Sequence, residues 1–475
     1  MFTKVLIANR GEIARRVIRT CKRMGIKTVA IYSDADAESP HVREADEAVR
    51  VGGPIAKESY LNVEAIVQAC RDTGAQAVHP GYGFVSENSG FARSLAEAGV
   101  VFIGPPPAVL DAFGDKMKAR SVALAAGTSP VPGTDEPVAV GTPEGNAFAT
   151  EVANRVGYPV VIKAVGGGGG IGMQVVREES GMAKALQACS DRGKASFSDA
   201  RVYLEHYVSR PRHIEVQVFA DTHGQAFALG ERECSLQRRH QKIVEESPSP
   251  AAFFEGEAGA ARRAKLHEAA LRVVRHVGYV GAGTCEFIAD ANGELYFLEV
   301  NARLQVEHPV TEMVYGLDLV EWQLRVANGE RLPDWSGLKP RGHSIEARIY
   351  AEDPSKSFMP KPGDVNELSW GGGGGERLDG QLRVESAVMA GNKVTPYYDP
   401  MVAKVVTWGE DRAAAIKALD DVLGGTHIAP LVTNIPFVRA VLVSDAFAQG
   451  DYDTAYAESF AKSWAAAAKA AAATV

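Results

Sequence analysis

Residues 283–303 read GTCEFIADANGELYFLEVNAR, which is two apolar segments joined by Asn292 and Gly293. Asn-Gly is the preferred pair for a two-residue type I′ turn, so the stretch predicts a β-hairpin. Such a turn places Glu286 opposite Glu299 on one face of the hairpin. Three expected pairs occupy the other, apolar face: Cys285 with Val300, Phe287 with Leu298, and Ala289 with Tyr296.

The facing carboxylates indicate a cation. Two like charges directly opposite each other destabilise a sheet, and a divalent ion between them removes the conflict. Asn301 is the next oxygen ligand on the same face, and the set suits Mg²⁺ or Mn²⁺ carrying nucleotide phosphates. The alternatives are one protonated glutamate or a pair that spreads apart into solvent.

The segment after the hairpin, NARLQVEHP at 301–309, carries a second polar group. In an extended conformation Asn301, Arg303, Gln305 and Glu307 share one face. Arg303 offers a planar fork for a small oxyanion, and Glu307 can serve as a general base beside it. The alternative is a solvated polar face.

A glycine run interrupts residues 159–173, PVVIKAVGGGGGIGM. The run formally matches GxGxxG, but a dinucleotide site needs a helix after the turn, and MQVVRE predicts a strand. Strand, glycine loop and strand form a flap that can cover phosphates, with Lys163 in reach of one. The alternative is a flexible hairpin tip. A second run, 371–375, has no nearby lysine and predicts a surface loop without ligand.

Polar residues also recur in two other segments. RRHQKIVEESP (238–248) predicts that His240 and Lys242 share a strand face, and RHIEVQVF (212–219) predicts the same for His213, Glu215 and Gln217. Each group taken alone is more often structural than functional. Their case rests on assembly around one site.

Composition excludes several classes of protein. The 475 residues carry a net charge of −8 and a pI near 5.8, which argues against a general nucleic-acid binder. The five cysteines are far apart and form no CxxC pair, which argues against zinc and disulfides and favours the reducing cytoplasm. We expect no signal peptide and no membrane span, because no long apolar segment is present.

The chain divides into regions of different pattern. Residues 1–100 alternate short strands with helices near 62–73 and 88–98, which predicts a parallel sheet. Residues 129–145 are rich in Pro, Gly and Thr and predict a linker. From 207 the strands predict a mostly antiparallel sheet, followed from 340 by a further β-rich stretch and a helix at 412–423. The tail SWAAAAKAAAATV predicts a marginal helix or a disordered linker.

Several runs together resemble the biotin carboxylases, which are ATP-grasp enzymes. They are IANRGEIA, HPGYGFVSEN, GDK, VIKAVGGGGGIGM, ERECSLQRRHQKIVEESP, FLEVNARLQVEHPVTE and RGHSIEARIYAEDP, in family order over about 1–455. The resemblance implies an α/β and α+β ATP-grasp fold. Its expected parts are a Rossmann-like pre-ATP-grasp domain (1–115), a connecting helix (116–129), a mobile lid (130–206), a core with the metal and bicarbonate sites (207–335), an antiparallel C-terminal domain (336–455) and an Ala-rich tail (456–475).

The resemblance also implies a nucleotide site. ATP is the expected substrate, and two Mg²⁺ or Mn²⁺ ions are expected on Glu286, Glu299 and Asn301. The residues expected to contact ATP are Lys116, Lys163, Gly169, Gly170, Glu205, His206, Tyr207, Val208, His213, Gln237 and His240.

Bicarbonate is expected on Lys242, Arg303, Gln305, the Val306 amide and Glu307. Glu307 then deprotonates bicarbonate for attack on the γ-phosphate, which gives carboxyphosphate and then CO₂ and phosphate. Phosphate deprotonates biotin N1, Arg348 stabilises the biotin enolate, and Tyr82 and Gly83 approach biotin. The expected catalytic set is Arg303, Glu307, Lys242 and Arg348.

The implied partners are a biotin carboxyl carrier protein or domain, a carboxyltransferase and a second copy of the chain. An acetyl-CoA or other acyl-CoA carboxylase is the expected whole enzyme, and pyruvate and urea also remain open as acceptors. The chain has no Met-Lys-Met biotinylation motif, so it is a stand-alone subunit or a fragment of a longer α-subunit. Four positions depart from the family: Ile171 and Gln174 replace basic residues of the lid, Ala302 replaces a usual Thr or Pro, and Arg23 replaces an acidic residue of the bacterial dimer interface.

Two other functions remain open at this point. One is a different ATP-grasp ligase, which the runs QVEHPVTE and RRHQK disfavour. The other is a non-catalytic scaffold subunit with a degraded lid, which Ile171 suggests and the retained acidic and basic residues oppose.

Overall fold

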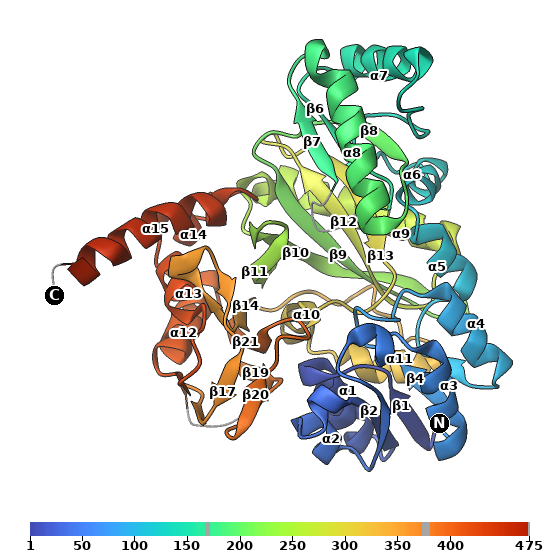
Figure 1. Ribbon diagram of the computed structural model, residues 1–475, viewed down its shortest axis with the longest axis vertical. Helices are drawn as coiled ribbons and strands as arrows, with labels where there is room; N and C mark the ends of the chain where they lie inside the picture. Colours follow the sequence, from blue (N-terminus) through green and yellow to red (C-terminus); the bar gives the residue numbers. More distant parts are fainter. Residues whose placement is uncertain (167–171, 373–380, 474–475) are drawn as a thin grey trace.

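A computed structural model describes residues 1–166, 172–372 and 381–473 of the chain. Its N-terminal part, at the bottom of Figure 1, is a five-stranded parallel sheet in the order β3-β2-β1-β4-β5. The strands are β1 (Lys4–Ile7), β2 (Lys27–Ser33), β3 (Glu47–Gly52), β4 (Ala77–His79) and β5 (Val101–Phe102). The connecting helices are α1 (Gly11–Arg23), α2 (Pro40–Glu44), α3 (Val63–Thr73) and α4 (Ser89–Glu97). The predicted parallel sheet is confirmed.

Side-chain caps begin the helices of this region where the sequence places Asn or Asp. The Asn62 side chain accepts from the Ala65 amide at α3, and Asn88 accepts from Phe91 at α4. These bonds satisfy donors that a helix leaves free in its first turn. Two further helices lead to the next unit: α5 (Pro107–Phe113) and α6 (Lys116–Ala125).

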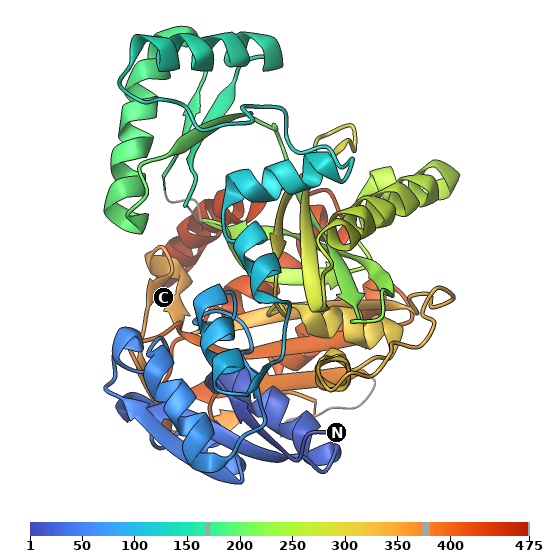
Figure 2. The same ribbon diagram turned by 90° about the vertical axis from the view of Figure 1, so that its right-hand side faces the viewer.

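The lid unit stands apart at the top of the molecule in Figures 1 and 2. It contains α7 (Pro143–Val156), β6 (Val160–Ala164), β7 (Met173–Val176), α8 (Met182–Phe197) and β8 (Val202–His206). β6 pairs antiparallel with both β7 and β8, so the two strands predicted on either side of the glycine run are confirmed as an antiparallel pair. Gly169, Gly170 and Ile171 lie outside the described residues.

An eight-stranded antiparallel sheet forms the centre, in the order β13-β12-β9-β10-β11-β14-β21-β19. Its strands are β9 (Arg212–Ala220), β10 (Ala226–Arg238), β11 (Gln241–Ser247), β12 (Gly281–Ala289), β13 (Leu295–Asn301), β14 (His343–Tyr350), β19 (Leu382–Ser386) and β21 (Met401–Gly409). Three helices accompany it: α9 (Gly256–His276), α10 (His308–Tyr315) and α11 (Leu319–Ala327). The predicted antiparallel sheet is therefore confirmed.

The hairpin β12–β13 confirms the sequence prediction at its open end and corrects it at its turn. Cys285 pairs with Val300 and Glu286 with Glu299, as expected. A register shift follows, and the remaining pairs are Phe287 with Phe297, Ile288 with Tyr296, and Ala289 with Leu295. The turn is longer than two residues, with Gly293 at φ +77° and its amide bonded to the Asp290 carbonyl. An extra residue in the turn is compensated by a bulge, which leaves the glutamates facing each other.

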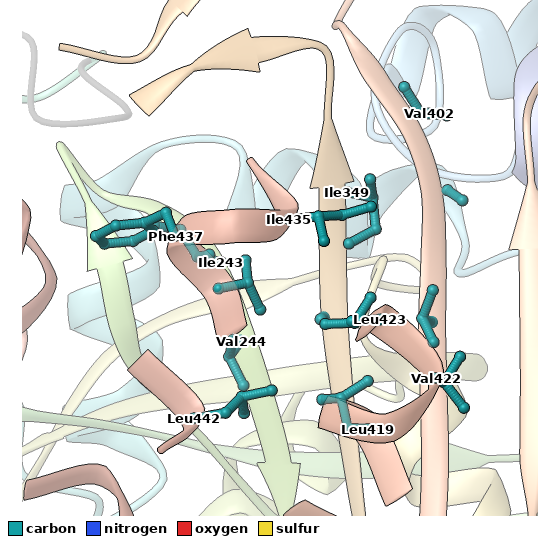
Figure 3. Close-up of a cluster of buried hydrophobic side chains, with 14 of the residues drawn as sticks. Ile243, Val244, Ile349, Val402, Leu419, Val422, Leu423, Ile435, Phe437 and Leu442 are labelled. Carbon is teal, nitrogen blue, oxygen red and sulfur yellow. The ribbon is translucent and has the colours of Figure 1, made fainter. Parts of the chain in front are cut away.

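The C-terminal part packs helices against the far half of the central sheet. Its helices are α12 (Arg412–Gly424), α13 (Ile435–Leu442), α14 (Asp445–Ala448) and α15 (Tyr456–Ala473), and its short strands are β15 (Glu352–Asp353), β16 (Met359–Pro360), β17 (Gly363–Val365), β18 (Glu367–Ser369), β20 (Asn392–Val394) and β22 (His427–Ala429). Figure 3 shows Leu419 and Leu423 of α12 against Ile349 of β14, within one buried hydrophobic cluster.

The Ala-rich tail is helical from Tyr456. Phe460 and Trp464 pack their rings against Phe437 of α13. The helix then projects away from the rest of the molecule (Figure 1). Among the described helices, none combines the length and apolar character that crossing a membrane requires.

The second glycine run begins in close contact with a helix. A Cβ on Gly371 would lie 2.0 Å from the Val422 carbonyl oxygen of α12. The expected surface loop continues at 373–380, outside the described residues. We expect Gly371→Ala to lower the free energy of unfolding by about 1–3 kcal/mol, because backbone must move to admit the methyl group.

Chemical unfolding of Gly371→Ala beside Gly337→Ala checks this prediction. Gly337 has open space around it, so its variant controls for the general effect of adding a methyl group. Equal unfolding midpoints for the two variants would contradict the prediction.

Candidate functional site

One row of charged residues crosses four neighbouring strands of the central sheet. Glu299 of β13 pairs with Glu286 of β12, which pairs with Glu215 of β9, which pairs with Arg232 of β10. Directly paired residues of an antiparallel sheet project to the same face, so these four side chains form a single polar band. Three of them are carboxylates, and the protein surrounds them with cations.

The predicted metal ligands lie together at one end of this band. The Asn301 amide donates to Glu286 Oε1 at 2.6 Å, and His213 Nε2 is 2.8 Å from Glu286 Oε2. Lys116 Nζ is 2.5 Å from Glu299 Oε2. Asp115 caps α6 and so makes Lys116 the first residue of that helix, facing β13. The oxygens of the Glu286–Glu299 pair fit a hard divalent cation.

Electrostatics keep this end of the site charged. Burial opposes ionisation of Glu286, but Lys242 and His213 hold its pKa well below the usual range. The pKa of His213 is raised, since Glu286 outweighs the effect of burial. Glu299 raises the pKa of Lys116 in the same way. One sequence alternative, a protonated glutamate in the pair, does not fit Glu286.

Lys242 and Glu307 form the centre of the site. Lys242 Nζ donates to Glu307 Oε1 at 2.6 Å, contacts Glu215, and lies 3.5 Å from Glu286. Arg348 Nη2 donates to Glu307 Oε2 at 3.1 Å. Burial would raise the pKa of Glu307, but Lys242 and Arg348 hold it well below the usual range. Glu307 is therefore an ionised carboxylate gripped from two sides.

The loop that carries Glu307 differs from the sequence prediction. β13 ends at Asn301, residues 302–307 form an irregular loop, and α10 begins at His308. The expected extended strand with one polar face is therefore wrong. The side chains nevertheless gather, because Gln305 Nε2 donates to Glu286 at 2.9 Å and Arg303 Nη2 donates to Asn301 at 2.6 Å.

Three charged partners of the site, Glu87, Glu245 and Arg232, were missed by the sequence analysis. Glu87 accepts from Arg303 Nε at 2.9 Å, and Glu245 accepts from Arg348 Nε at 2.6 Å. Arg232, fully buried, donates to Gln305 at 2.5 Å and to Glu215. Glu215 was noted in the sequence only as a neighbour of His213. The available signals were Glu87 within HPGYGFVSEN and charged residues within strands that otherwise belong to the core.

The predicted nucleotide residues lie along the lid side of the site. Lys163 of β6 is 2.5 Å from Glu205 of β8, and His206 Nδ1 is 3.1 Å from the Gly157 carbonyl. Tyr207 and the buried Val208 follow β8, and the buried Gln237 lies near the end of β10.

His240 departs from its predicted position on a strand. It occupies the β10–β11 turn at φ +65° and is exposed, so it does not share a strand face with Lys242. Partial desolvation of the ring and the charges of Lys163 and His213 lower the pKa of His240, against the opposite effect of Glu458.

The predicted biotin residues Tyr82 and Gly83 belong to the loop that follows β4 in the N-terminal part of the chain. Tyr82 follows β4, its hydroxyl donates to Glu12, and the positive charge of Arg348 acts on it. Gly83 is exposed at φ +67° with open space around its Cα. Asn9 holds this loop by donating to the Pro80 and Tyr82 carbonyls.

His79 supports the same loop and makes the stability of the fold depend on pH. The ring is fully buried, accepts from the Gly81 amide at Nδ1, and contacts Gln323 through Nε2. Burial, opposed by Gln323 and Asp318 and aided by Arg16, lowers the pKa of His79 to about 4. The neutral ring therefore stabilises the fold above about pH 6.5, and this stabilisation, about 3 kcal/mol, is lost as the pH falls through about 4.

We expect the difference in melting temperature between the wild type and His79→Asn to shrink between pH 7.5 and pH 4.5. Asparagine has no proton to gain in this window, so only the wild type loses the contribution of His79. Thermal unfolding followed by circular dichroism measures both proteins at each pH. A difference that stays constant with pH would contradict the prediction.

Three family models match the chain in order. They are the biotin carboxylase N-terminal domain over 1–110, the ATP-binding domain of the carbamoyl-phosphate synthase L chain over 115–335, and the biotin carboxylase C-terminal domain over 346–459. Together they cover most of the sequence.

Full-length relatives carry the same assignment. The biotin carboxylase of Halalkalibacterium halodurans is 48% identical over 457 residues, which cover 96% of this chain and 97% of that protein. The propionyl-CoA carboxylase alpha chain of Ruegeria pomeroyi is 46% identical over 471 residues, and the methylcrotonoyl-CoA carboxylase subunit alpha of Dictyostelium discoideum is 46% identical over 455. The chain spans 68% and 63% of the lengths of these two α-subunits.

Solved structures agree with the fold. The biotin carboxylase complex from Campylobacter jejuni has a TM-score of 0.90 at 42% identity and covers 96% of this chain and 98% of its own. The biotin carboxylase domain dimer of 2-oxoglutarate carboxylase from Hydrogenobacter thermophilus, in complex with MgADP and bicarbonate, has a TM-score of 0.89 at 41% identity, with 97% and 98% coverage.

Proposed function

This chain belongs to the biotin carboxylase family, and on that premise we propose that it carboxylates biotin with ATP and bicarbonate. It is an ATP-dependent ligase of the ATP-grasp fold. The single observation that supports this activity best is the buried group of Lys242, Glu307 and Arg348 beside the facing carboxylates Glu286 and Glu299. A base held by two cations next to a metal-binding pair suits activation of an anionic oxygen nucleophile.

The nucleotide is proposed to bind between the lid and the central sheet. Lys116, Lys163 and His213 supply cationic groups for the phosphates, with His240 and the buried Gln237 nearby. Residues 205–208 are proposed to line the adenine, and the glycines expected over the phosphates, Gly169 and Gly170, lie outside the described residues. A divalent metal, Mg²⁺ or Mn²⁺, held by Glu286, Glu299 and Asn301 would neutralise charge on the transferring phosphoryl group.

Bicarbonate is proposed to lie against Lys242, Arg303, Gln305 and the Val306 amide. Glu307 takes the bicarbonate proton while a bicarbonate oxygen attacks the γ-phosphorus and ADP departs. The product, carboxyphosphate, breaks into CO₂ and phosphate. Phosphate then takes the N1 proton of biotin, and N1 attacks CO₂ to give carboxybiotin.

The charges around Glu307 make its basicity depend on the substrate. Lys242 and Arg348 depress the pKa of Glu307, and a strongly depressed pKa makes a weak base. Bicarbonate binds the same cations and offsets their charge, so the basicity of Glu307 rises when its substrate arrives. The ion pair of Arg348 with Glu307 is then weakened. Arg348 can therefore stabilise the biotin enolate, with Tyr82 and Gly83 beside it.

The acceptor of the whole carboxylase is proposed to be an acyl-CoA. The named α-subunits act on propionyl-CoA and methylcrotonoyl-CoA. Acetyl-CoA, with fatty acid biosynthesis as its context, belongs to the same class of acceptor. The proposed partners are a biotin carboxyl carrier protein or domain and a carboxyltransferase, and the proposed compartment is the cytoplasm.

A homodimer is proposed despite Arg23. The departure from an acidic residue is balanced within the chain, because Arg23 Nη2 lies 2.7 Å from Asp318 and 2.6 Å from Glu321. Arg23 lines a cavity of about 670 Å³ together with Arg16, Arg19 and Trp408. Sedimentation velocity over a concentration series tests the proposal, and a monomer at all concentrations would contradict it.

The activity is tested by ADP release from the purified chain with ATP, Mg²⁺, bicarbonate and free biotin. We expect release to require bicarbonate and to rise with biotin, and ¹⁴C-bicarbonate to appear in carboxybiotin. Release that ignores both substrates would indicate another ATP-grasp ligase. A folded protein that binds ATP without turnover would indicate a non-catalytic scaffold.

A further inference from the structure

A buried lysine outside the proposed reaction contacts the loop that carries the base. Lys404 lies on β21, and its side chain is fully buried. Its Nζ donates to the Val306 carbonyl oxygen at 2.7 Å. A buried lysine is rare unless its charge is paired, so these contacts need an explanation.

The contact between Lys404 and Val306 bears on the chemistry because Val306 directly precedes the proposed base, Glu307. Its carbonyl belongs to the peptide unit that joins Val306 to Glu307, and a peptide unit is planar. A hydrogen bond that holds this oxygen also holds the Glu307 amide nitrogen and Cα, because they lie in the same plane. Lys404 therefore restrains the base through the backbone, whereas Lys242 and Arg348 hold its carboxylate.

The charge of Lys404 is met by an acid from the N-terminal domain. Glu12, in the first turn of α1 and 2% exposed, brings Oε2 to 3.3 Å from Lys404 Nζ. Its other oxygen, Oε1, accepts the Tyr82 hydroxyl. One carboxylate thus contacts the proposed biotin loop on one side and the lysine behind the bicarbonate loop on the other.

Two other acids face Lys404 and are satisfied differently. Glu385 of β19 lies directly opposite Lys404 in the sheet and forms ion pairs with Arg383 and Arg19. Glu346 of β14 is fully buried, and burial raises its pKa well above the usual range, against the opposing effect of Lys404. Glu12 is the acid that forms an ion pair with Lys404 among the described residues, and Lys404 opposes the rise that burial and Glu385 cause in the Glu12 pKa.

We propose that Lys404 and Glu12 are positioning residues that link the biotin side of the site to the bicarbonate side. Lys404 sets the position of the Val306–Glu307 peptide, and Glu12 holds Lys404 and Tyr82 in one arrangement. The proposal rests on the proposed function. It predicts that loss of Lys404 weakens bicarbonate use and that loss of the Glu12 charge weakens biotin use.

The test compares Lys404→Met, Glu12→Gln and the double variant in the ADP-release assay. For Lys404→Met we expect the KM for bicarbonate to rise about tenfold or more, with the KM for ATP changed less than about twofold. For Glu12→Gln we expect the KM for biotin to rise and the KM for bicarbonate to change little, because the bond from Lys404 to Val306 remains.

The double variant separates positioning from stability. Each single change leaves a buried charge without its partner, whereas the double change removes both charges. We expect its melting temperature to recover toward the wild type while its KM for bicarbonate stays raised. Recovery of both quantities would mean that Lys404 is only structural, and would overturn the proposal even if Lys404→Met alone fails to fold.

Lys417→Met, at an exposed lysine of α12, is the matched control and should behave as the wild type. A wild type without bicarbonate-dependent ADP release would overturn the proposed function and this inference together. An active wild type with an unchanged bicarbonate KM in Lys404→Met would overturn the inference alone.

Discussion

Glu307→Gln is expected to lower kcat for bicarbonate-dependent ADP release by about 10²- to 10⁴-fold, the range typical of a lost general base. The amide cannot take the bicarbonate proton, although it keeps the shape of the side chain. We also expect the nucleotide to bind normally, since Glu307 contacts Lys242 and Arg348 and not the lysines proposed to hold the phosphates. Initial rates and ATP titration followed by calorimetry measure the two effects.

The matched control is Glu294→Gln, an exposed glutamate at the end of the β12–β13 turn. Its rates should equal those of the wild type. A Glu307→Gln variant that keeps more than about a tenth of the wild-type kcat would remove Glu307 from the role of base. The reaction would then need another proton acceptor. Glu215, which also contacts Lys242, would be the next residue to replace.

Arg232→Met is expected to destabilise the protein by about 3–5 kcal/mol, because it removes one partner from a buried ion pair. The guanidinium is fully buried and donates to Gln217, Thr311, Thr284, Gln305 and Glu215. Methionine fills part of the volume but leaves these acceptors without a donor. Glu215 in particular would lose one of its ion-pair partners, which also include Lys242 and His213.

Chemical unfolding of Arg232→Met beside Arg155→Met measures the effect, since Arg155 is exposed near the end of α7. The midpoint of the control should stay close to the wild type. An Arg232→Met midpoint that also stays there would show that the buried polar band tolerates loss of its central cation. Activity of any folded fraction would then indicate whether Gln305 keeps its position.

The hairpin shows how far a sequence argument reaches. The Asn-Gly signal correctly predicted a turn and the pairing of Glu286 with Glu299. It did not predict the longer turn, in which Gly293 approaches Phe253 so closely that a Cβ would lie 2.6 Å from that side chain. It also did not predict the bulge after Glu286 that restores the register. Both depend on packing against segments far away in the sequence.

The site residues also divide into those that the sequence could predict and those that it could not. Residues in motifs, such as Lys242, Arg303 and Glu307, could be predicted because the chemistry requires those residue types. Their partners could not, since Glu87 and Lys404 come from distant strands and loops that only the folded chain brings to residues 303–307. The extended form of this loop was predicted from alternation alone, and the start of α10 at His308 overrides it.

The ion pair between Lys116 and Glu299 joins two residues with different proposed ligands. Lys116 neutralises a proposed metal ligand, and Glu299 holds a proposed phosphate-binding cation. A metal that binds Glu299 frees Lys116 for a phosphate, so the two binding events favour each other. By thermodynamic linkage, the factor by which metal raises nucleotide affinity equals the factor by which nucleotide raises metal affinity.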